Sequence, residues 1–250
     1  GSYVPKEIVT NKDLAQYLDT DDTWIRERTG VKSRHISGDK ETTADMAVKA
    51  AEKALDNSGL LPDEIDLIIV SSVSSNLVLP STACFVQKAI NAKNAFCFDI
   101  NVACTGFITA YNISQTFINT GLINTALIIG AESLSKITDW SDRKTCILFG
   151  DGAGAVVIKK DENAMFETVM FSNGKNGDAL TMENPFALRK TNLGKNHQGQ
   201  FDISFQDVHK TYINMDGGEI FKFAVKKVPE CIEALLEKIH MDKSEIDKYL

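Results

Sequence analysis

The sequence predicts an α/β fold in which helices cover both faces of a mostly parallel sheet. Apolar segments of strand length alternate with segments of helical periodicity from residue 43 to residue 159. The predicted strands are apolar throughout, which is typical of strands buried on both faces of a parallel sheet. The regular alternation of strands and helices favours the same layered arrangement.

Each predicted element has a recognisable start or stop. The first helix starts at Thr43 and ends at 57–59, where Gly59 follows the last helical turn. Pro80 opens the second helix, because proline is favoured in a first turn, and that helix runs to Ile90. The other predicted elements are strands at 67–70, 95–100, 126–130, 146–149 and 153–159 and a helix at 106–119.

A short pattern recurs near the end of the chain. Glu-Ile-Asp at 64–66 follows a helix and a turn, and Glu-Ile-Asp at 245–247 does the same 181 residues later, with Leu55 matching Leu236. The repeat is compatible with two duplicated halves and also with chance similarity between two helix-strand units. With duplicated halves, we expect the chain to stop in the middle of the second one.

A polar segment spans residues 182–211. It contains Asn184-Pro185 and a glycine-containing run at 194–199, and it has few periodic apolar positions. A strand-like run resumes at Tyr212-Ile213. We therefore predict a long surface excursion rather than a linker between domains.

The composition excludes several classes of protein. With 43% apolar and 24% charged residues, the chain is globular and not disordered, collagenous or of low complexity. A net charge of −7 without a basic run argues against nucleic acid or an anionic membrane as a partner. No apolar stretch approaches the roughly 18 residues of a spanning helix, and no charged-then-apolar leader opens the chain, so we expect a cytoplasmic protein.

The cysteines and histidines give no metal or disulfide pattern. The five cysteines are odd in number and include no Cys-x-x-Cys pair, which favours a reducing compartment and argues against a zinc site. Four of them fall within predicted helices or strands and are interpreted as small inert side chains: Cys84, Cys97, Cys146 and Cys231. The four histidines lack metal-ligand spacing and fall in predicted loops or helix ends, so none is identified as a general base.

Cys104 is the candidate nucleophile. It follows the strand predicted at 95–100, and the small residues Thr105-Gly106 lead into the next helix. A thiol at such a turn faces the positive end of the helix dipole, which favours the thiolate. The amides there could also stabilise an oxyanion that forms beside the sulfur. The alternative is an inert buried cysteine, and position alone does not decide between the two.

Two other motifs can be interpreted either as functional sites or as structural features. The glycine-rich run at 150–154 superficially resembles a phosphate loop but lacks the Gly-Lys-Ser/Thr ending and precedes a strand, so we predict a tight hairpin whose glycines allow positive φ and close backbone approach. The segments 24–30 and 140–143 each place a tryptophan near an arginine. Together they could bind a flat base and phosphates, whereas alone each would be a surface ion-pair cluster packed on an indole.

Taken in order, these motifs resemble β-ketoacyl-acyl-carrier-protein synthase III, the initiating condensing enzyme of the thiolase superfamily. The similarity covers nearly the whole chain and is carried by residues 1–5, 19–20, 24–30, 80–84, 99–107, 142–143, 149–155 and 215–222. It implies a five-layered αβαβα thiolase-like fold built from two similar halves. Residues 1–160 would form the half that carries the nucleophile, and residues 161–250 would begin the second half.

The resemblance also implies a reaction. A cysteine at the position of Cys104 takes an acyl group from acyl-CoA and condenses it with malonyl-acyl-carrier protein, with loss of carbon dioxide. CoA enters as part of a substrate, and no cofactor or metal is implied. Leu79 matches a residue that reaches into the pocket of a partner subunit, so a homodimer is implied.

Roles for further residues follow from the same resemblance. Trp24 and Arg143 match a pair that sandwiches the CoA adenine, and Thr20 and Arg28 match contacts to the nucleotide and its phosphates. The remaining matches are Phe149, Leu180 and Ile213 in the acyl pocket, Met215, Gly217 and Phe221 in the pantetheine tunnel, and Lys222 as a carrier-protein contact.

The sequence departs from the family pattern in two respects. The family's His-Gln-Ala-Asn motif and a later asparagine do not occur in the 250 residues. We expect this catalytic histidine and asparagine beyond Leu250, in a C-terminal portion of roughly 70 residues, with about eight residues of a first strand also lacking at the front. The segment 182–211 is longer than in typical members. It leaves open a related condensing enzyme of secondary metabolism, and a non-catalytic homologue that binds acyl-CoA or carrier protein is the third alternative.

Overall fold

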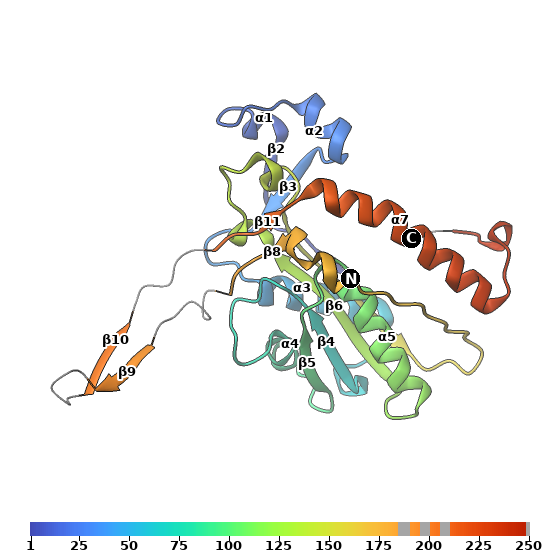
Figure 1. Cartoon of the computed structure of the whole chain (residues 1–250). Coiled ribbons are helices and arrows are strands. Elements are labelled where there is room, and N and C mark those ends of the chain that lie inside the picture. The colour runs from blue at the N-terminus through green and yellow to red at the C-terminus, as the bar shows by residue number, and fades with distance from the viewer. Residues whose placement is uncertain (185–190, 196–200, 206–210, 249–250) are drawn as a thin grey trace.

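The central unit is a five-stranded sheet with the order β1-β7-β6-β4-β5 (Figure 1). The computed structural model describes residues 1–184, 191–195, 201–205 and 211–248. β4 (Leu67–Ser71) runs parallel to β5 (Phe96–Ile100) and to β6 (Thr125–Ser133). β7 (Asp151–Lys159) is antiparallel to β6 and to β1 (Ser2–Tyr3). The sheet is therefore mixed, and the expectation of a mostly parallel sheet holds only for β4, β5 and β6.

Helices cover both faces of this sheet, as predicted. α3 (Thr43–Ser58) and α4 (Thr82–Ile90) pack on one face, where Ile68, Val70 and Leu127 point into a shared core. α5 (Gly106–Asn119) packs on the other face against Leu67 and Ile69. Alternate residues of the same buried strand thus enter two different cores, which explains why the strands are apolar throughout.

A smaller unit lies at the top of Figure 1. β2 (Glu7–Thr10) pairs antiparallel with β3 (Ser33–Ile36), and α1 (Asn11–Leu14) and α2 (Asp22–Thr29) follow β2 along the chain. Its core joins Leu14 and Ile25 to Cys146 and Ile147. Residues far apart in the sequence therefore meet here.

Two expectations about the segment before β7 are wrong. The strand expected at 146–149 does not form. Cys146 is instead the last residue of the short helix α6 (Arg143–Cys146), whose first turn is capped by the Asp142 side chain, and Cys146 packs into the smaller core. Gly150 and Gly152 do not have positive φ and do not form a hairpin. Close approach is nevertheless required at Gly150, where a Cβ would lie 2.9 Å from the Cβ of Arg34.

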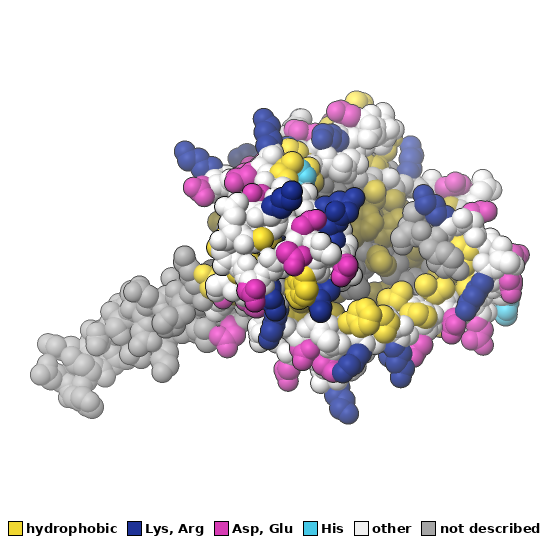
Figure 2. All heavy atoms as spheres, turned by 90° about the horizontal axis from the view of Figure 1, so that it is seen from above, with side chains coloured by type: hydrophobic (Ala, Val, Ile, Leu, Met, Phe, Trp, Pro, Cys, Tyr) yellow, Lys and Arg dark blue, Asp and Glu magenta, His cyan; other side chains and the backbone are white. Residues whose placement is uncertain are grey.

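The C-terminal part contains one long helix. The 3₁₀ turns η3 (Leu134–Ile137) and η4 (Gly174–Ala179) precede it, β8 (Leu180–Thr181) pairs with β11 (Asn214–Met215), and α7 spans Gly217–Ile239. Four large apolar side chains of α7 are exposed: Phe221, Phe223, Val225 and Val228. Figure 2 shows apolar groups in a row on this side of the molecule. Across the described ranges, no helix is both long and apolar enough to span a membrane.

The segment 182–211 is described only in part. Thr191–Lys195 (β9) and Phe201–Phe205 (β10) form an antiparallel pair. The expectation of a surface excursion otherwise concerns residues 185–190, 196–200 and 206–210, which lie outside the described residues, as do His197 and His209. The strand-like run expected at Tyr212-Ile213 forms two residues later, as β11.

The recurring Glu-Ile-Asp pattern has the same local geometry at both places. In η1 (Pro62–Glu64) the Glu64 carboxylate accepts from the amide of Leu61 at 2.8 Å, and in η5 (Lys243–Glu245) the Glu245 carboxylate accepts from the amide of Asp242 at 2.7 Å. The preceding helices, α3 and α7, each end at a residue with positive φ. The sequence match therefore extends to the backbone conformation.

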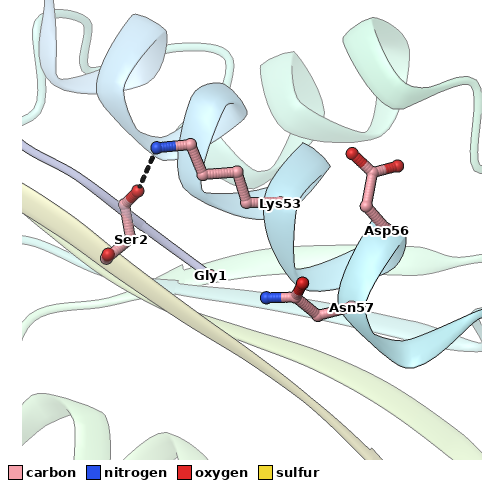
Figure 3. A pocket seen from close by; sticks show the side chains of 5 residues that line it. All are labelled: Gly1, Ser2, Lys53, Asp56 and Asn57. Atoms are coloured by element: carbon pink, nitrogen blue, oxygen red, sulfur yellow. Dashed lines mark hydrogen bonds between the residues drawn. The ribbon is translucent and has the colours of Figure 1, made fainter.

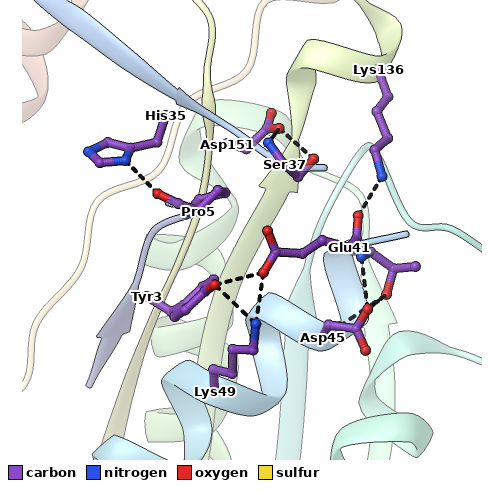
Figure 4. A network of polar contacts seen from close by, with 10 residues as sticks. Tyr3, Pro5, His35, Ser37, Glu41, Asp45, Lys49, Lys136 and Asp151 are labelled. Carbon is purple, nitrogen blue, oxygen red and sulfur yellow. Dashed lines mark hydrogen bonds and ion pairs between the residues drawn. The ribbon is translucent and has the colours of Figure 1, made fainter. Parts of the chain in front are cut away.

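Carboxylates stabilise the loops around the sheet by accepting hydrogen bonds from them. Asp151, at the start of β7, accepts hydrogen bonds from the amides and hydroxyls of Ser37 and Ser135. Nearby, Glu41 accepts from Tyr3 and from Lys49 (Figure 4). Lys49 also donates to the Tyr3 hydroxyl, and its hydrogen bonds to Glu41 and Tyr3 raise the pKa of Lys49 to about 12. These contacts join β1, α3 and the segment before β7.

Glu132, in β6, holds the segment that follows β4. Its carboxylate accepts from the amide of Val73 at 3.0 Å and from the hydroxyls of Ser72 and Ser74. Burial raises the pKa of Glu132, while these hydrogen bonds oppose the shift. The carboxylate thus fixes a loop at the carboxyl end of the parallel strands.

α5 begins in direct contact with β4. A Cβ at Gly106 would lie 1.8 Å from the hydroxyl oxygen of Ser71 and 2.9 Å from its Cβ. Contacts this short require glycine, since both the helix start and the strand are buried. The first turn of α5 is therefore set by its packing on β4.

Replacement of Glu132 by glutamine changes the pH dependence of stability. Because the folded protein binds the Glu132 proton more tightly than the unfolded chain, the wild type loses stability as pH rises from 4.5 through the raised pKa. The variant lacks this loss. Its free energy of unfolding, measured by urea denaturation, should therefore increase relative to that of the wild type as pH rises above about 4.5.

Glu41→Gln is the matched control, because the contribution of Glu41 to stability depends on pH in the opposite direction. Hydrogen bonds from Lys49 and Tyr3 lower the pKa of Glu41, so its contribution is present above 4.5 and is lost as pH falls through the lowered value. Identical pH profiles for Glu132→Gln and wild type would contradict the assignment of Glu132.

Gly106→Ala should destabilise the protein by about 1–3 kcal/mol, because the added methyl overlaps Ser71. The cost should be smaller when Ser71 is also replaced by glycine. Gly154→Ala is the control, since no atom lies within 4 Å of a Cβ built there. An equal cost for Gly106→Ala in both backgrounds would show that the contact does not set the helix start.

Candidate active site

Cys104 lies in a strained turn between β5 and α5. The 3₁₀ turn η2 (Ala103–Thr105) leads directly into the helix at Gly106, and the Cys104 side chain is exposed. Ala103 has φ of 46°, which is uncommon for a residue with a side chain. Such strained positions persist only where the surrounding structure enforces them, and they cluster at functional sites. The strand-turn-helix setting expected for Cys104 is therefore present.

A cavity of about 930 Å³ opens beside this turn, and Cys104 lies on its wall. Phe149, Leu180 and Ile213 also line it. They come from three separate segments of the chain, so the fold brings together the residues that the resemblance assigns to an acyl pocket. The volume falls within the range of small-molecule sites.

The cavity wall is held by groups that the sequence did not single out. Asp99 lines the cavity and accepts from the amides of Thr82 and Ala83 at 2.6 and 2.8 Å, which ties the first turn of α4 to β5. Glu132 also lines it and anchors the segment after β4. Both residues could have been found from the sequence, because each is an acidic residue within a predicted strand or just beyond its end. A buried charge at such a position needs hydrogen-bond partners.

Among the described residues, the cavity is lined by no histidine, and no cluster suited to a metal ion occurs. The ionisable groups on its wall other than Cys104 are Asp99, Glu132, Lys136 and Glu183. His35 lies elsewhere and contacts the carbonyl of Pro5 at 2.6 Å, and His240 is the C-cap of α7.

The histidine and asparagine expected as partners of Cys104 would follow Leu250 in the chain. Leu250 itself lies outside the described residues. Their place beyond Leu250 stays a prediction.

A second hollow, of about 380 Å³, lies where the N-terminus meets α3 (Figure 3). It is lined by Gly1, Ser2, Lys53, Asp56 and Asn57, and Lys53 donates to the carbonyl of Ser2. Its lining contains no cysteine or histidine. It therefore offers no nucleophile or general base of these types.

The tryptophan and arginine expected to hold a nucleotide meet in the structure. The guanidinium carbon of Arg143 lies 4.7 Å from the centre of the Trp24 ring, and that of Arg28 lies 4.5 Å from it. Arg143 also donates to the carbonyl of Asp19, which fixes α6 beside the segment that precedes α2. Two segments more than a hundred residues apart thus form one cationic aromatic surface.

Thr20 immediately precedes the N-cap of α2. Its hydroxyl oxygen is buried and has no hydrogen-bond partner among the described residues. Buried hydroxyls are normally paired, so the unpaired oxygen of Thr20 is an exception.

The other expected residues lie outside the lining of the cavity. Met215 pairs with Leu180 across β11 and β8 and so adjoins the wall, and Gly217 is the first residue of α7. Phe221 is 67% exposed on α7. Lys222 is ion-paired with Glu219 at 2.8 Å, and this contact raises the pKa of the lysine.

Leu79 is 83% exposed, in the segment between β4 and α4. Its neighbours Leu77 and Val78 are also exposed. Three consecutive large apolar side chains therefore face outward beside the cavity, two of which, Leu77 and Val78, belong to its lining.

Comparisons with known proteins agree with this arrangement. Residues 98–174 match the family model described as 3-oxoacyl-[acyl-carrier-protein (ACP)] synthase III. The beta-ketoacyl-[acyl-carrier-protein] synthase III of Clostridium acetobutylicum is 46% identical over 99% of this chain and 73% of its own length. The corresponding protein of Xylella fastidiosa is 40% identical, over 99% of this chain and 72% of its own length.

Solved structures give the same result. The crystal structure of 3-oxoacyl-[acyl-carrier-protein] synthase III from Aquifex aeolicus superposes with a TM-score of 0.84 at 40% identity, covering 98% of this chain and 72% of that one. The priming beta-ketosynthase of the R1128 polyketide pathway gives a TM-score of 0.78 at 27% identity, covering 97% of this chain and 77% of that one. The expected thiolase-like fold is confirmed, and the chain belongs to the β-ketoacyl-[acyl-carrier-protein] synthase III family.

Proposed function

We propose that the protein condenses an acyl-CoA primer with malonyl-acyl-carrier protein through an acyl-Cys104 intermediate, the initiating step of fatty acid synthesis. The observation that carries the proposal is Cys104 itself, exposed on the wall of a cavity at the start of α5. The reaction would give a 3-oxoacyl-carrier protein, carbon dioxide and CoA.

In the first stage, the Cys104 sulfur attacks the thioester carbonyl of acyl-CoA. The new carbon–sulfur bond replaces the bond to CoA, and CoA leaves as a thiol of similar leaving ability. Cys104 lies in the turn that leads into the first residues of α5, and the start of a helix suits the negative charge that develops on the thioester oxygen during attack. The acyl chain would lie against Phe149, Leu180 and Ile213.

In the second stage, malonyl-carrier protein loses carbon dioxide, and the electron pair of the broken bond forms the new carbon–carbon bond to the acyl carbon. The Cys104 thiolate leaves and takes up a proton. The resemblance assigns the polarising groups of this stage to a histidine and an asparagine in motifs that do not occur in the 250 residues. The described residues therefore account for the acyl-enzyme and the pocket.

Trp24, Arg28, Arg143 and Thr20 would bind the nucleotide of CoA. An aromatic face with two guanidinium groups suits a purine and its phosphates, through stacking and charge-assisted hydrogen bonds. Arg143 now lies directly on the Trp24 ring, so an adenine between them would displace its guanidinium. Met215, Gly217 and Phe221 would guide the pantetheine, and Lys222 would contact the carrier protein.

A homodimer is part of the same proposal. Leu79 and its exposed neighbours would insert beside the cavity of a second subunit, which would bury apolar surface that is open in a single chain. Residues 1–160 and 161–250 would belong to two similar halves, as the equivalent geometry of η1 and η5 supports. We place the reaction in the cytoplasm.

One observation favours a second candidate, a condensing enzyme of secondary metabolism. The polyketide priming synthase shares the fold at a TM-score of 0.78, and the cavity of about 930 Å³ has room for longer acyl groups. Rates of acylation across acyl-CoA chain lengths separate the two, since a preference for long or aromatic chains would favour the second candidate.

Cys104→Ala should lower acyl transfer from acyl-CoA by about a thousandfold or more, because the variant lacks the nucleophile. Intact-mass spectrometry after incubation with acetyl-CoA checks this by detecting one added acetyl group on wild type and none on the variant. Cys231→Ala, in α7, is the matched control and should be acylated normally. Acylation of Cys104→Ala at the wild-type rate would refute the proposal.

Trp24→Ala should raise the KM for acyl-CoA roughly tenfold, because loss of stacking on a base costs about 1–3 kcal/mol. Acylation by an acyl-pantetheine, which has no nucleotide, should be unchanged, as steady-state kinetics with the two substrates would show. Arg26→Ala is the control on the same helix, where Arg26 pairs with Asp22 at 3.4 Å instead of contacting the ring. An equal loss with both substrates would mean that Trp24 acts only through folding.

A further inference from the structure

Two cysteines that the sequence marks as inert lie side by side. The sulfur of Cys84, in α4, is 3.4 Å from the sulfur of Cys97, in β5. Both side chains are partly exposed. Thirteen residues separate them in the sequence, and only the packing of α4 on β5 brings them together.

The polar surroundings give the two sulfurs different roles. Cys84 accepts a hydrogen bond from the hydroxyl of Ser81 at 3.1 Å. Cys97 donates toward the side-chain oxygen of Gln87 at 3.7 Å. Burial, and then the neighbouring Cys84, raise the pKa of Cys97 to about 12, so Cys97 keeps its proton at neutral pH.

α4 and β5 are already tied together on both sides of this pair. On one side Asp99 accepts from the amides of Thr82 and Ala83. On the other side, the side-chain amide nitrogen of Gln87 donates to the backbone carbonyl of Ala95. Because the cysteines lie between two fixed points, the helix and the strand hold the sulfurs near each other, about 1.4 Å beyond the bond length of a disulfide.

We propose that Cys84 and Cys97 are a redox modification site, in which a hydroperoxide oxidises the two thiols to a disulfide between them. This chemistry is separate from acyl transfer at Cys104. The Cys84 thiolate attacks the outer oxygen of the hydroperoxide, the oxygen–oxygen bond breaks, and an alkoxide (hydroxide from hydrogen peroxide) leaves and takes up the proton that the Cys84 thiol released, to give an alcohol (or water). The resulting sulfenic acid on Cys84 is attacked by the Cys97 sulfur. The sulfur–oxygen bond breaks, and the Cys97 proton leaves with the oxygen as water.

The two thiols supply both electrons that reduce the hydroperoxide. A dithiol such as dithiothreitol returns both electrons and restores the thiols. The disulfide would join α4 to the strand that leads to Cys104, beside Asp99 on the cavity wall. The modification would therefore lie next to the acyl pocket without using its nucleophile.

Hydrogen peroxide treatment of the Cys104→Ala protein tests the proposal, because this variant cannot react at Cys104. Alkylation of the remaining four cysteines should show two thiols lost, and mass spectrometry of the digest should find the peptides of Cys84 and Cys97 linked. Dithiothreitol should return both thiols. Wild-type acylation by acetyl-CoA, measured separately, tests the proposed function and does not depend on this result.

Two further variants in the same background locate the bond. Cys97→Ser should remove the linked peptide and leave Cys84 as sulfenic acid, which a dimedone probe detects, whereas Cys231→Ser should keep the link. The proposal is overturned if Cys84 and Cys97 both remain alkylated after peroxide treatment, or if either forms its bond with another cysteine.

Discussion

The start of α5 against β4 is the contact on which the site depends. Gly106 lies so close to Ser71 that no side chain fits there, and the chain must therefore leave β5 and enter the helix within the η2 turn. Ala103 takes up this constraint in a left-handed backbone conformation. The result is a short, strained turn that presents Cys104 at the carboxyl end of the parallel strands, where α/β folds commonly place their ligands.

Three carboxylates of the central sheet hold neighbouring segments in place, and two of them, Asp99 and Glu132, line the cavity. Asp99, Glu132 and Asp151 each lie within a strand or at its end, and each accepts several hydrogen bonds from a loop or a helix start. Their burial is offset by these donors, as buried carboxylates require. Among the described residues that line the cavity, Cys104 carries the one thiol, and Asp99 and Glu132 hold the wall in place, which is a preorganised arrangement for receiving an acyl group.

The sequence predicted those features that depend on local periodicity. The helices expected from Thr43 to 57–59 and at 106–119 form, and the strand expected at 67–70 forms as β4 (Leu67–Ser71), because two cores lie on opposite faces of the same strands. It failed at 146–149, where the Asp142 cap and the packing of Cys146 override a strand-like composition. The expectation of parallel pairing is wrong for β7, because an apolar run does not indicate whether its strand pairs parallel or antiparallel.

The candidate site was predicted in part, because only some of its features depend on local sequence. Cys104 could be identified from its position between a strand and a helix, whereas the contact between Trp24 and Arg143 joins segments that only tertiary packing brings together. The Cys84 and Cys97 sulfurs likewise meet through helix-on-sheet packing, which a spacing of 13 residues cannot reveal.

We propose that the acyl group of the substrate is transferred to the Cys104 sulfur within the cavity of about 930 Å³. A crystal structure of the protein after exposure to acetyl-CoA would reveal the acyl-enzyme itself. We expect continuous density for an acetyl group bonded to the Cys104 sulfur and directed toward Phe149, Leu180 and Ile213. Unmodified Cys104 in crystals that carry the acetyl group on another residue would contradict it.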